Sequence, residues 1–338
     1  MKMMIRGKNF ILVVVLIMCL ALSTQVCSQE QVKDWPKYVS IGSGSYGGGM
    51  FMAASAVAAA LQKELPDLNV TVEVTGAAVE NSRLVQGQEV EIGLITTEVS
   101  WDAYYGEGTF KDLGAHSDLR TIFPGYSSVK IIVTNSIYGF ERFEDLDGKL
   151  ISPGTPNSAN EVFTLRAIEA AGIKPAGLQA MPTPDASAAL QSQQIHAYTV
   201  GFPNATTSEL DISNPGLVQI LFLEGDTLER FLEMFPQYFY PMTLPAGSLS
   251  CITEDVIHLG EYISFFTYKD APEDFIYEIV KAVYENREKV IKNSYMPFYN
   301  GMDVANVDKT FIPYHKGAVK YFNEIGVDIP DELIPPEM

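Results

Sequence analysis

The chain has 338 residues, of which 47% are hydrophobic and 19% are charged, as is usual for a folded globular protein. This length exceeds that of a typical single core, so it indicates two domains or one large α/β domain. The formal net charge of −19 at pH 7 repels nucleic acid and anionic lipid, and we expect no nucleic-acid partner. Acidity also keeps a protein soluble, so the charge identifies no partner by itself.

The first residues have the pattern of an export signal. A basic segment at 1–9 precedes an apolar run at 10–22, which is short for a membrane span of about 20 residues. We predict cleavage near Ser28, so that residues 1–28 form a signal peptide and the mature protein is periplasmic or otherwise extracytoplasmic. Two alternatives remain: an uncleaved anchor helix, and a lipoprotein attached at Cys27.

Disulfide and metal chemistry find little support in the sequence. Cys19 and Cys27 fall inside the predicted signal, so a cleaved chain keeps Cys251 alone and has no intramolecular disulfide. The four histidines are scattered along the chain: His116, His196, His258 and His315. Because no Cys or His cluster has metal-ligand spacing, we predict no metal and no cofactor.

No catalytic signature stands out. The chain lacks a Gly-x-Ser-x-Gly elbow, a His-Glu-x-x-His helix and a P-loop. Carboxylate pairs are so frequent in this acidic chain that none is distinguished as a glycosidase couple. We predict that the protein is not an enzyme, and an exported enzyme is the least favoured alternative.

Strands and helices alternate in the first third of the mature chain. Apolar and alternating segments predict strands at 38–41, 70–74 and 92–96. An Ala-rich segment closed by Pro66 predicts a helix at 50–64, and a second helix is predicted at 79–86, ending before Gly87. The repeated order of strand, turn and helix predicts a parallel α/β sheet.

The same order returns further along the chain. Strands are predicted at 130–134, 150–151 and 196–200, and a helix at 159–171 ends before Gly172. The remaining predicted helices are a long amphipathic one at 273–293 and a C-terminal one at 318–325.

Two small-residue loops connect a strand to a helix, at 42–49 and 152–158. Glycines let the backbone approach a ligand, and a helix N-terminus presents free N–H groups with a positive partial charge. Such a terminus binds a carboxylate or a phosphate, whereas the simpler alternative is that the glycines only make tight turns. If the two loops face each other across a cleft, they converge on one ligand.

The first loop also fits the dinucleotide fingerprint, with Gly42, Gly44 and Gly47 at the required spacing. That site needs an acidic residue about 20 residues further on, at the end of the second strand. Glu73 lies too far along the chain to serve, and an exported protein rarely meets free NAD. Dinucleotide binding is therefore disfavoured.

Four segments, taken in their order and spacing, resemble a known family. The first is 41–49, and the second is 75–84 followed by Gly87 and 90–98. The third is 145–149 with 153–158, and the fourth is 244–248 with the chain ending at 313–318 and 326–333. The sequence resembles the TAXI class of TRAP-transporter solute-binding proteins, over nearly the whole mature chain.

The resemblance implies an α/β, type II periplasmic-binding-protein fold with two lobes, each a mixed sheet flanked by helices. One lobe would hold 36–125 and 246–338, and the other 126–245. A small anionic or zwitterionic ligand would bind in the cleft between them, and glutamate, glutamine and 2-oxoglutarate-like acids are the expected class. The partner would be a TRAP membrane permease. The alternative is a sensor subunit that reports the ligand to a membrane signalling protein.

The resemblance also implies site residues. They are Gly44, Ser45, Tyr46, Asn81, Thr96, Thr97, Thr155, Asn157, Ser158, Ala159 and Phe202. Asn81 would offer its side-chain amide, and Phe202 would shield the ligand. Arg83 and Arg166 lie on predicted helices, where we expect them to be solvated. Neutral donors would then hold the ligand carboxylate.

Overall fold

The computed structural model describes residues 35–203, 205–235, 239–293 and 301–338, and the predicted signal peptide lies outside them. The strands are β1 (Tyr38–Gly42), β2 (Asn69–Glu73), β3 (Ile92–Thr96), β4 (Leu119–Asn135), β5 (Leu150–Ser152), β6 (Gly177–Leu178), β7 (Ala197–Phe202), β8 (Val218–Leu221), β9 (Tyr240–Leu244) and β10 (Val256–Tyr268). The helices are α2 (Gly49–Glu64), α3 (Ala78–Gln86), α4 (Thr97–Tyr105), α5 (Ala159–Ala171), α6 (Thr183–Gln191), α7 (Ala205–Ser213), α8 (Gly225–Met234), α9 (Glu273–Glu285), α10 (Arg287–Asn293) and α11 (Lys316–Glu324).

The described strands form one mixed sheet in the order β2-β1-β3-β10-β4-β7-β5-β6, with β8 beside β4 and β9 beside β10. The pairs β1–β2, β1–β3, β5–β6 and β5–β7 are parallel, as the alternation of strands and helices predicts. Strands β4 and β10 run antiparallel to their neighbours at the centre of the sheet. The sheet is therefore parallel at both ends and antiparallel in the middle.

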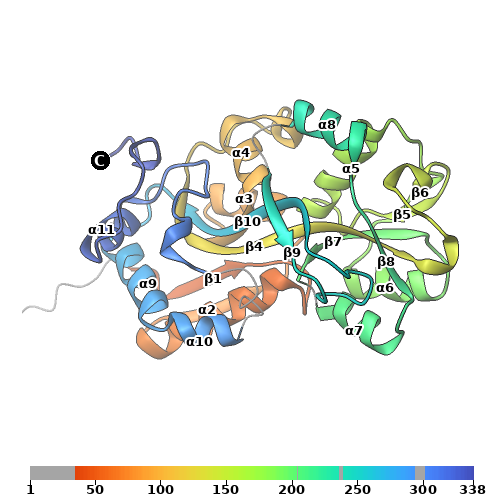
Figure 1. The fold of residues 1–338 in the computed structure, drawn as a ribbon. Helices are drawn as coiled ribbons and strands as arrows, with labels where there is room; N and C mark the ends of the chain where they lie inside the picture. Colours follow the sequence, from red (N-terminus) through yellow and green to blue (C-terminus); the bar gives the residue numbers. More distant parts are fainter. Residues whose placement is uncertain (1–34, 204, 236–238, 294–300) are drawn as a thin grey trace, which may run out of the picture. The chain divides into compact units, whose positions relative to one another are not determined.

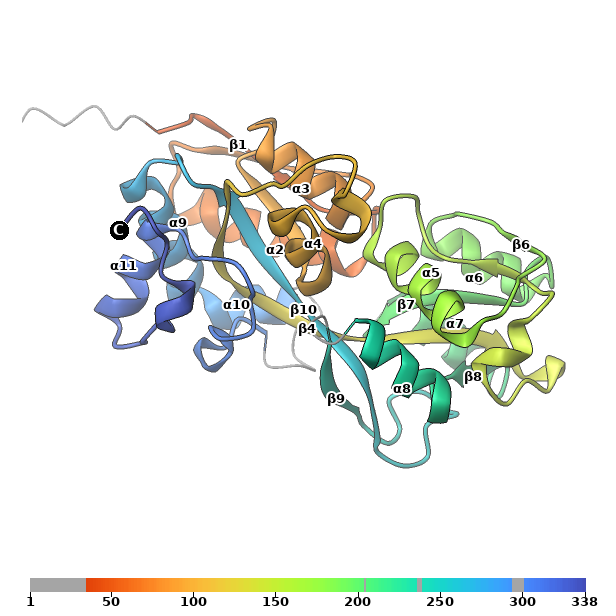
Figure 2. The same ribbon diagram turned by 90° about the horizontal axis from the view of Figure 1, so that it is seen from above.

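Two groups of helices surround the two ends of this sheet. Helices α2, α3, α4, α9, α10 and α11 lie around the end formed by β1, β2 and β3, and α5 to α8 lie around the end formed by β5, β6 and β7 (Figures 1 and 2). Strands β4 and β10 run from one group to the other. Within the described residues, no helix has both the length and the apolar character needed to span a bilayer.

The predicted local elements agree closely with the structure. Strand β3 and helix α5 have their predicted bounds, and α2 and α3 each begin one residue earlier than predicted. The helix predicted at 273–293 is wrong as a single element, because α9 ends at Glu285 and α10 begins at Arg287. The side-chain amide of Asn286 donates to the Ala282 carbonyl, a local hydrogen bond that competes with helix continuation.

Strand β4 packs apolar side chains on both of its faces near its carboxyl end. Val129, Ile131 and Val133 belong to a core with β7 and α6. Ile132 faces the opposite side, in a core with Phe163 of α5 and further residues of α8. Burial on both faces explains why this part of the chain has an uninterrupted apolar run rather than an alternating one.

The predicted lobe boundaries stay a prediction. The predicted boundary after residue 245 assigns Leu249 and Ile252 to the lobe that contains 246–338. In the structure these two residues pack with Ile131 and Val200. Their side chains therefore lie with the core that contains β7.

Candidate functional site

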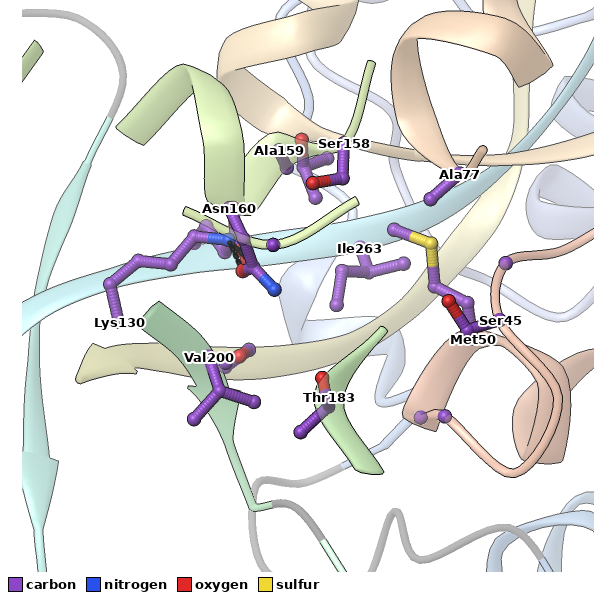
Figure 3. Close-up of a pocket in the computed structure, with 18 of the residues that line it drawn as sticks. Ser45, Met50, Ala77, Lys130, Ser158, Ala159, Asn160, Thr183, Val200 and Ile263 are labelled. Carbon is purple, nitrogen blue, oxygen red and sulfur yellow. Dashed lines mark hydrogen bonds and ion pairs between the residues drawn. The ribbon is translucent and has the colours of Figure 1, made fainter. Parts of the chain in front are cut away.

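The two predicted loops line one cavity of about 110 Å³. Figure 3 shows Ser45 and Met50 on one side of this cavity, with Ser158 and Ala159 on the other. The lining residues are Gly44, Ser45, Gly48, Gly49, Met50, Ala77, Thr96, Tyr126, Ser128, Lys130, Gly154, Thr155, Ser158, Ala159, Asn160, Thr183, Val200, Gly201, Pro203, Glu261 and Ile263. The convergence expected from the two loops is therefore present.

The first loop, residues 42–49, is held by contacts from distant parts of the chain. The Ser43 hydroxyl and amide both donate to the Glu73 carbonyl, at 2.7 and 3.0 Å. Helix α2 begins after Gly48, which has no side chain to cap it. The N–H groups in the first turn of α2 therefore have no cap from the side chain of the N-cap residue. They lie at the cavity, which Gly48, Gly49 and Met50 line.

The side chain of Asn81 holds this loop in place through hydrogen bonds and does not line the cavity. Its amide nitrogen donates to the Ser43 carbonyl at 2.8 Å and to the Leu94 carbonyl at 2.7 Å. Its amide oxygen accepts from the Thr75 hydroxyl at 2.7 Å. The amide predicted to contact the ligand is instead used to join the first loop to β3.

The second loop, residues 152–158, is held by side chains of its own region and by two backbone contacts from elsewhere. The Asn157 and Gly154 carbonyls accept from the Val79 and Met181 amides at 3.2 and 3.1 Å. The Ser158 hydroxyl caps α5 by accepting from the Glu161 amide at 3.2 Å. The Glu161 carboxylate reaches back and accepts from the Asn157 amide at 2.7 Å. Asn157 has φ of 62°, a left-handed conformation that Asn tolerates better than most residues. This capping leaves the N–H groups of Ala159 and Asn160, the first two of α5, at the cavity.

Of the predicted site residues, six line the cavity: Gly44, Ser45, Thr96, Thr155, Ser158 and Ala159. The other five do not: Tyr46, Asn81, Thr97, Asn157 and Phe202. Tyr46 is 76% exposed, and Asn157 is exposed as well. Thr97 is buried in the first turn of α4. Phe202 packs in the core with Val129, so it does not shield the cavity.

The floor of the cavity comes from the two central strands. Tyr126, Ser128 and Lys130 are alternate residues of β4, and Glu261 and Ile263 are alternate residues of β10. Side chains two residues apart on a strand share one face, so these five point the same way. Tyr126 stays neutral, because burial and then the Glu261 carboxylate raise the pKa of its phenol.

A buried ion pair lies in this floor, where we expected only neutral donors. The Lys130 ammonium is 2.6 Å from a carboxylate oxygen of Glu261 and donates to the Asn160 side chain at 3.0 Å. Figure 3 shows Lys130 reaching toward Asn160 at the start of α5. One signal of this site was present in the sequence: Lys130 stands at the start of the otherwise apolar segment 130–134, which is predicted as a strand.

Arg166 is buried, which contradicts the expectation that it is solvated. Its guanidinium nitrogen lies 2.6 Å from an Asp102 carboxylate oxygen, and the guanidinium packs 4.8 Å from the Phe235 ring centre. Asp102 belongs to α4, so the pair joins α4 to α5. Arg83, in contrast, is exposed as expected.

Five of the described helices begin at the cavity. Lining residues include the first residues of α2, α5 and α6, and also Ala77 and Thr96, which precede α3 and α4. Each N-terminus carries a partial positive charge, so their convergence favours an anionic group. The described residues contain no group of three or more His, Cys, Asp or Glu side chains placed to hold a metal ion.

This architecture is that of the two-lobed α/β periplasmic binding proteins. A periplasmic transporter has a TM-score of 0.51 at 12% identity, with 76% of this chain and 85% of that chain covered. A protein from Bordetella bronchiseptica RB50 has a TM-score of 0.50 at 16% identity, with 88% and 91% covered. An ancestral arginine-binding protein bound to arginine has a TM-score of 0.49 at 14% identity, with 77% and 99% covered.

The family is also defined. The sequence profile of the NMT1-like family matches residues 41–326, and the chain belongs to this family.

Proposed function

We propose that the protein is an extracytoplasmic solute-binding subunit that captures a small anionic or zwitterionic solute between its two lobes. The observation that carries this proposal is the cavity itself, where the loops 42–49 and 152–158 meet from opposite sides. The membership in the NMT1-like family and the periplasmic-binding fold support it. The site residues are proposed as the six predicted residues that line the cavity, together with Lys130 and Glu261.

The size and charge of the cavity favour a small carboxylate. Drug-sized ligands occupy pockets of roughly 300–1,000 Å³, so a cavity of about 110 Å³ fits a solute no larger than an amino acid or a short organic acid. Lys130 and Glu261 neutralise each other, and the helix N-termini then provide the positive potential. Amino acids such as glutamate and glutamine, and acids such as 2-oxoglutarate, are the proposed class.

The resemblance to TAXI proteins extends the proposal to a TRAP-type permease as the membrane partner. Ligand closure would bend the central strands β4 and β10, which connect the two ends of the sheet. The proposed lobes are 36–125 with 246–338, and 126–245. The packing of Leu249 and Ile252 favours a second boundary closer to β10.

A thermal-shift screen of amino acids and organic acids tests the binding function. A ligand present at 100 times its dissociation constant stabilises the folded state by about 2.7 kcal/mol, which raises the melting temperature measurably. Ser45→Leu projects a larger side chain from the cavity lining and should abolish the shift. Ser192→Leu, at an exposed position, is the matched control and should keep it. If no carboxylate shifts the unaltered protein, the proposal is wrong.

A further inference from the structure

A row of four polar side chains, three of them buried, runs along the floor of the cavity. Glu98 belongs to α4, Glu261 to β10, Lys130 to β4 and Asn160 to α5. Lys130 connects to Glu261 and to Asn160, as described above. Glu98 lies at the other end of the row and does not line the cavity. The row therefore links helix α4 to the N-terminus of helix α5 through the two central strands, β10 and β4.

The end of β3 and the start of α4 bring the two carboxyl groups together. Ile263 of β10 pairs with Thr96 of β3 in an antiparallel ladder. Thr96 is the last residue of β3, and Glu98 follows it in the first turn of α4, while Glu261 precedes Ile263 by two residues on β10. The side chains of Glu98 and Glu261 are within hydrogen-bonding reach of each other. Both residues are buried, with exposed fractions of 1% and 0%.

Three carboxyl oxygens in this pair are left without a donor. Within the described part of the chain, both oxygens of Glu98 and Oε2 of Glu261 have no hydrogen-bond partner when the two groups are treated as acceptors. Oε1 of Glu261 is taken by the Lys130 ammonium. Two buried carboxylates beside one ammonium leave an uncompensated charge, which is strongly unfavourable. One proton between Glu98 and Glu261 removes this charge and supplies the missing donor.

We propose that Glu98 is a neutral carboxylic acid that donates its proton to Oε2 of Glu261, and that it is a positioning residue of the ligand site. With this hydrogen bond made, Glu261 stays ionised and holds the Lys130 ammonium next to Asn160, at the start of α5. An ionised Glu98 would add a negative charge behind the cavity and oppose an anionic solute. The consequence for ligand binding rests on the proposed function, whereas the position of the proton does not.

The charges around Glu98 are consistent with this assignment. Burial, and then the Glu261 carboxylate, raise the pKa of Glu98 well above its ordinary value, while Lys130 acts in the opposite direction. Tyr126 of β4 also faces Glu261 and is neutral. The proton is placed on Glu98 rather than on Glu261 because the ammonium contacts Glu261.

The raised pKa predicts a pH dependence of stability. Above the ordinary carboxyl pKa of 4.5, the unfolded chain loses the Glu98 proton while the folded chain keeps it. The stability associated with this group is therefore fully present below pH 4.5 and declines as the pH rises toward the raised folded value. Glu98→Gln keeps a donor for Glu261 but has no proton to lose, so its stability should not decline in this way.

The first experiment follows urea unfolding of the full chain from pH 4.5 to pH 9. The stability of Glu98→Gln relative to the unaltered protein should increase steadily with pH. Glu98→Leu, which has no donor, should be less stable than Glu98→Gln at every pH. Glu254→Gln, at an exposed carboxyl, is the matched control and should parallel the unaltered protein. Equal pH profiles for the unaltered protein and Glu98→Gln would overturn the proposal.

Difference infrared spectroscopy observes the proton directly and needs no ligand. The unaltered protein at pH 7 should show the carbonyl band of a protonated carboxylic acid, and Glu98→Gln should lack it. A band that persists in Glu98→Gln, or that is absent from both proteins, contradicts the assignment. This measurement stays decisive even if the proposed binding function is wrong.

Calorimetric titration with L-glutamate as the probe tests the link to binding. We expect Glu98→Gln to keep its affinity within about threefold and Lys130→Met to lose about tenfold or more. A loss in Glu98→Gln equal to that in Lys130→Met would show that Glu98 acts as a charged group, and would overturn the proposal. If L-glutamate binds none of the proteins while the infrared band is present, the proposed ligand class fails and the neutral Glu98 stands.

Discussion

The two loops that line the cavity both precede a helix N-terminus, but different side chains stabilise them. The loop before α5 is stabilised locally, since Ser158 caps the helix and Glu161 returns a hydrogen bond to Asn157. The loop before α2 has no side-chain cap and depends on Asn81, a residue of α3. The loop before α5 also accepts from distant backbone amides, among them that of Val79 in α3, so the contrast concerns side chains. The side-chain support of one loop is local, whereas that of the other comes from a helix that follows it by about thirty residues in the sequence.

Because the side-chain supports of the two loops differ, substitutions in them should lower stability by different amounts. A change in a local cap removes one hydrogen bond at one helix end, and neighbouring groups can turn to water. A change in a buried bridging side chain leaves several backbone groups without partners at once. We therefore expect the largest losses where α5 and the first loop are tied to distant elements, and the smallest loss at the local cap.

The largest effect is expected at the buried ion pair that ties α5 to α4. Arg166→Met leaves the Asp102 carboxylate buried without its guanidinium partner, and breaking such a pair costs about 3–5 kcal/mol. The free energy of unfolding from urea titration measures this loss. Arg142→Met removes an exposed arginine 3.8 Å from Glu144 and is the control, with an expected change below about 1 kcal/mol. Similar losses in both variants would mean that burial of the first pair is energetically irrelevant.

The next effect concerns the support of the first loop. Asn81→Leu keeps the size of the side chain but removes the two hydrogen bonds to the Ser43 and Leu94 carbonyls. Each buried carbonyl left unpaired costs about 1–3 kcal/mol, so we expect a loss of about 3 kcal/mol in the free energy of unfolding. The same variant should weaken any ligand-induced thermal shift, because the loop that lines the cavity loses its anchor.

Asn323→Leu is the matched control for this experiment, since Asn323 is exposed on α11. Its free energy of unfolding should change by less than about 0.5 kcal/mol. If Asn81→Leu proves as mild as this control, then the first loop does not depend on α3, and the contrast between the two loops is lost.

The local elements could be predicted because their signals lie within a few residues of one another. Helix α5 and strand β3 have their predicted bounds, since Ser158 and Gly172 stand at the ends of the helix and the strand is a short apolar run. The convergence of the two loops followed from the same reasoning. It needed only that a strand, a small-residue loop and a helix occur twice.

The central strands could not be predicted in the same way. Strand β4 is buried along its whole length of 17 residues, so it shows no alternation of apolar and polar positions. It also contains Pro124 and Gly125, which in a sequence indicate a turn. In the structure these two residues lie at a register shift against Ile263 and Ser264 of β10. A Cβ on Gly125 would collide with the Ile263 carbonyl, so the glycine permits this close approach.

The charged part of the site depended on contacts between residues far apart in the sequence. Lys130 and Glu261 lie far apart in the sequence, and no local pattern identifies them as an ion pair. Asn81 was predicted to contact the ligand because its sequence neighbours match a family motif, yet its amide serves the backbone. A motif therefore locates residues near the cavity, whereas the contacts of each side chain depend on the tertiary structure.

The smallest effect is expected at the local cap of the second loop. Ser158→Ala removes the hydroxyl that accepts from the Glu161 amide, and loss of such a cap costs about 1 kcal/mol. Urea unfolding measures this change against Ser192→Ala, an exposed serine at the end of α6, for which we expect a change below about 0.5 kcal/mol. Because Glu161 still reaches back to the Asn157 amide in Ser158→Ala, the loop keeps part of its local support. A loss as large as that of Asn81→Leu would show that the second loop also depends on distant contacts through its cap, and the two loops would then be supported in the same way.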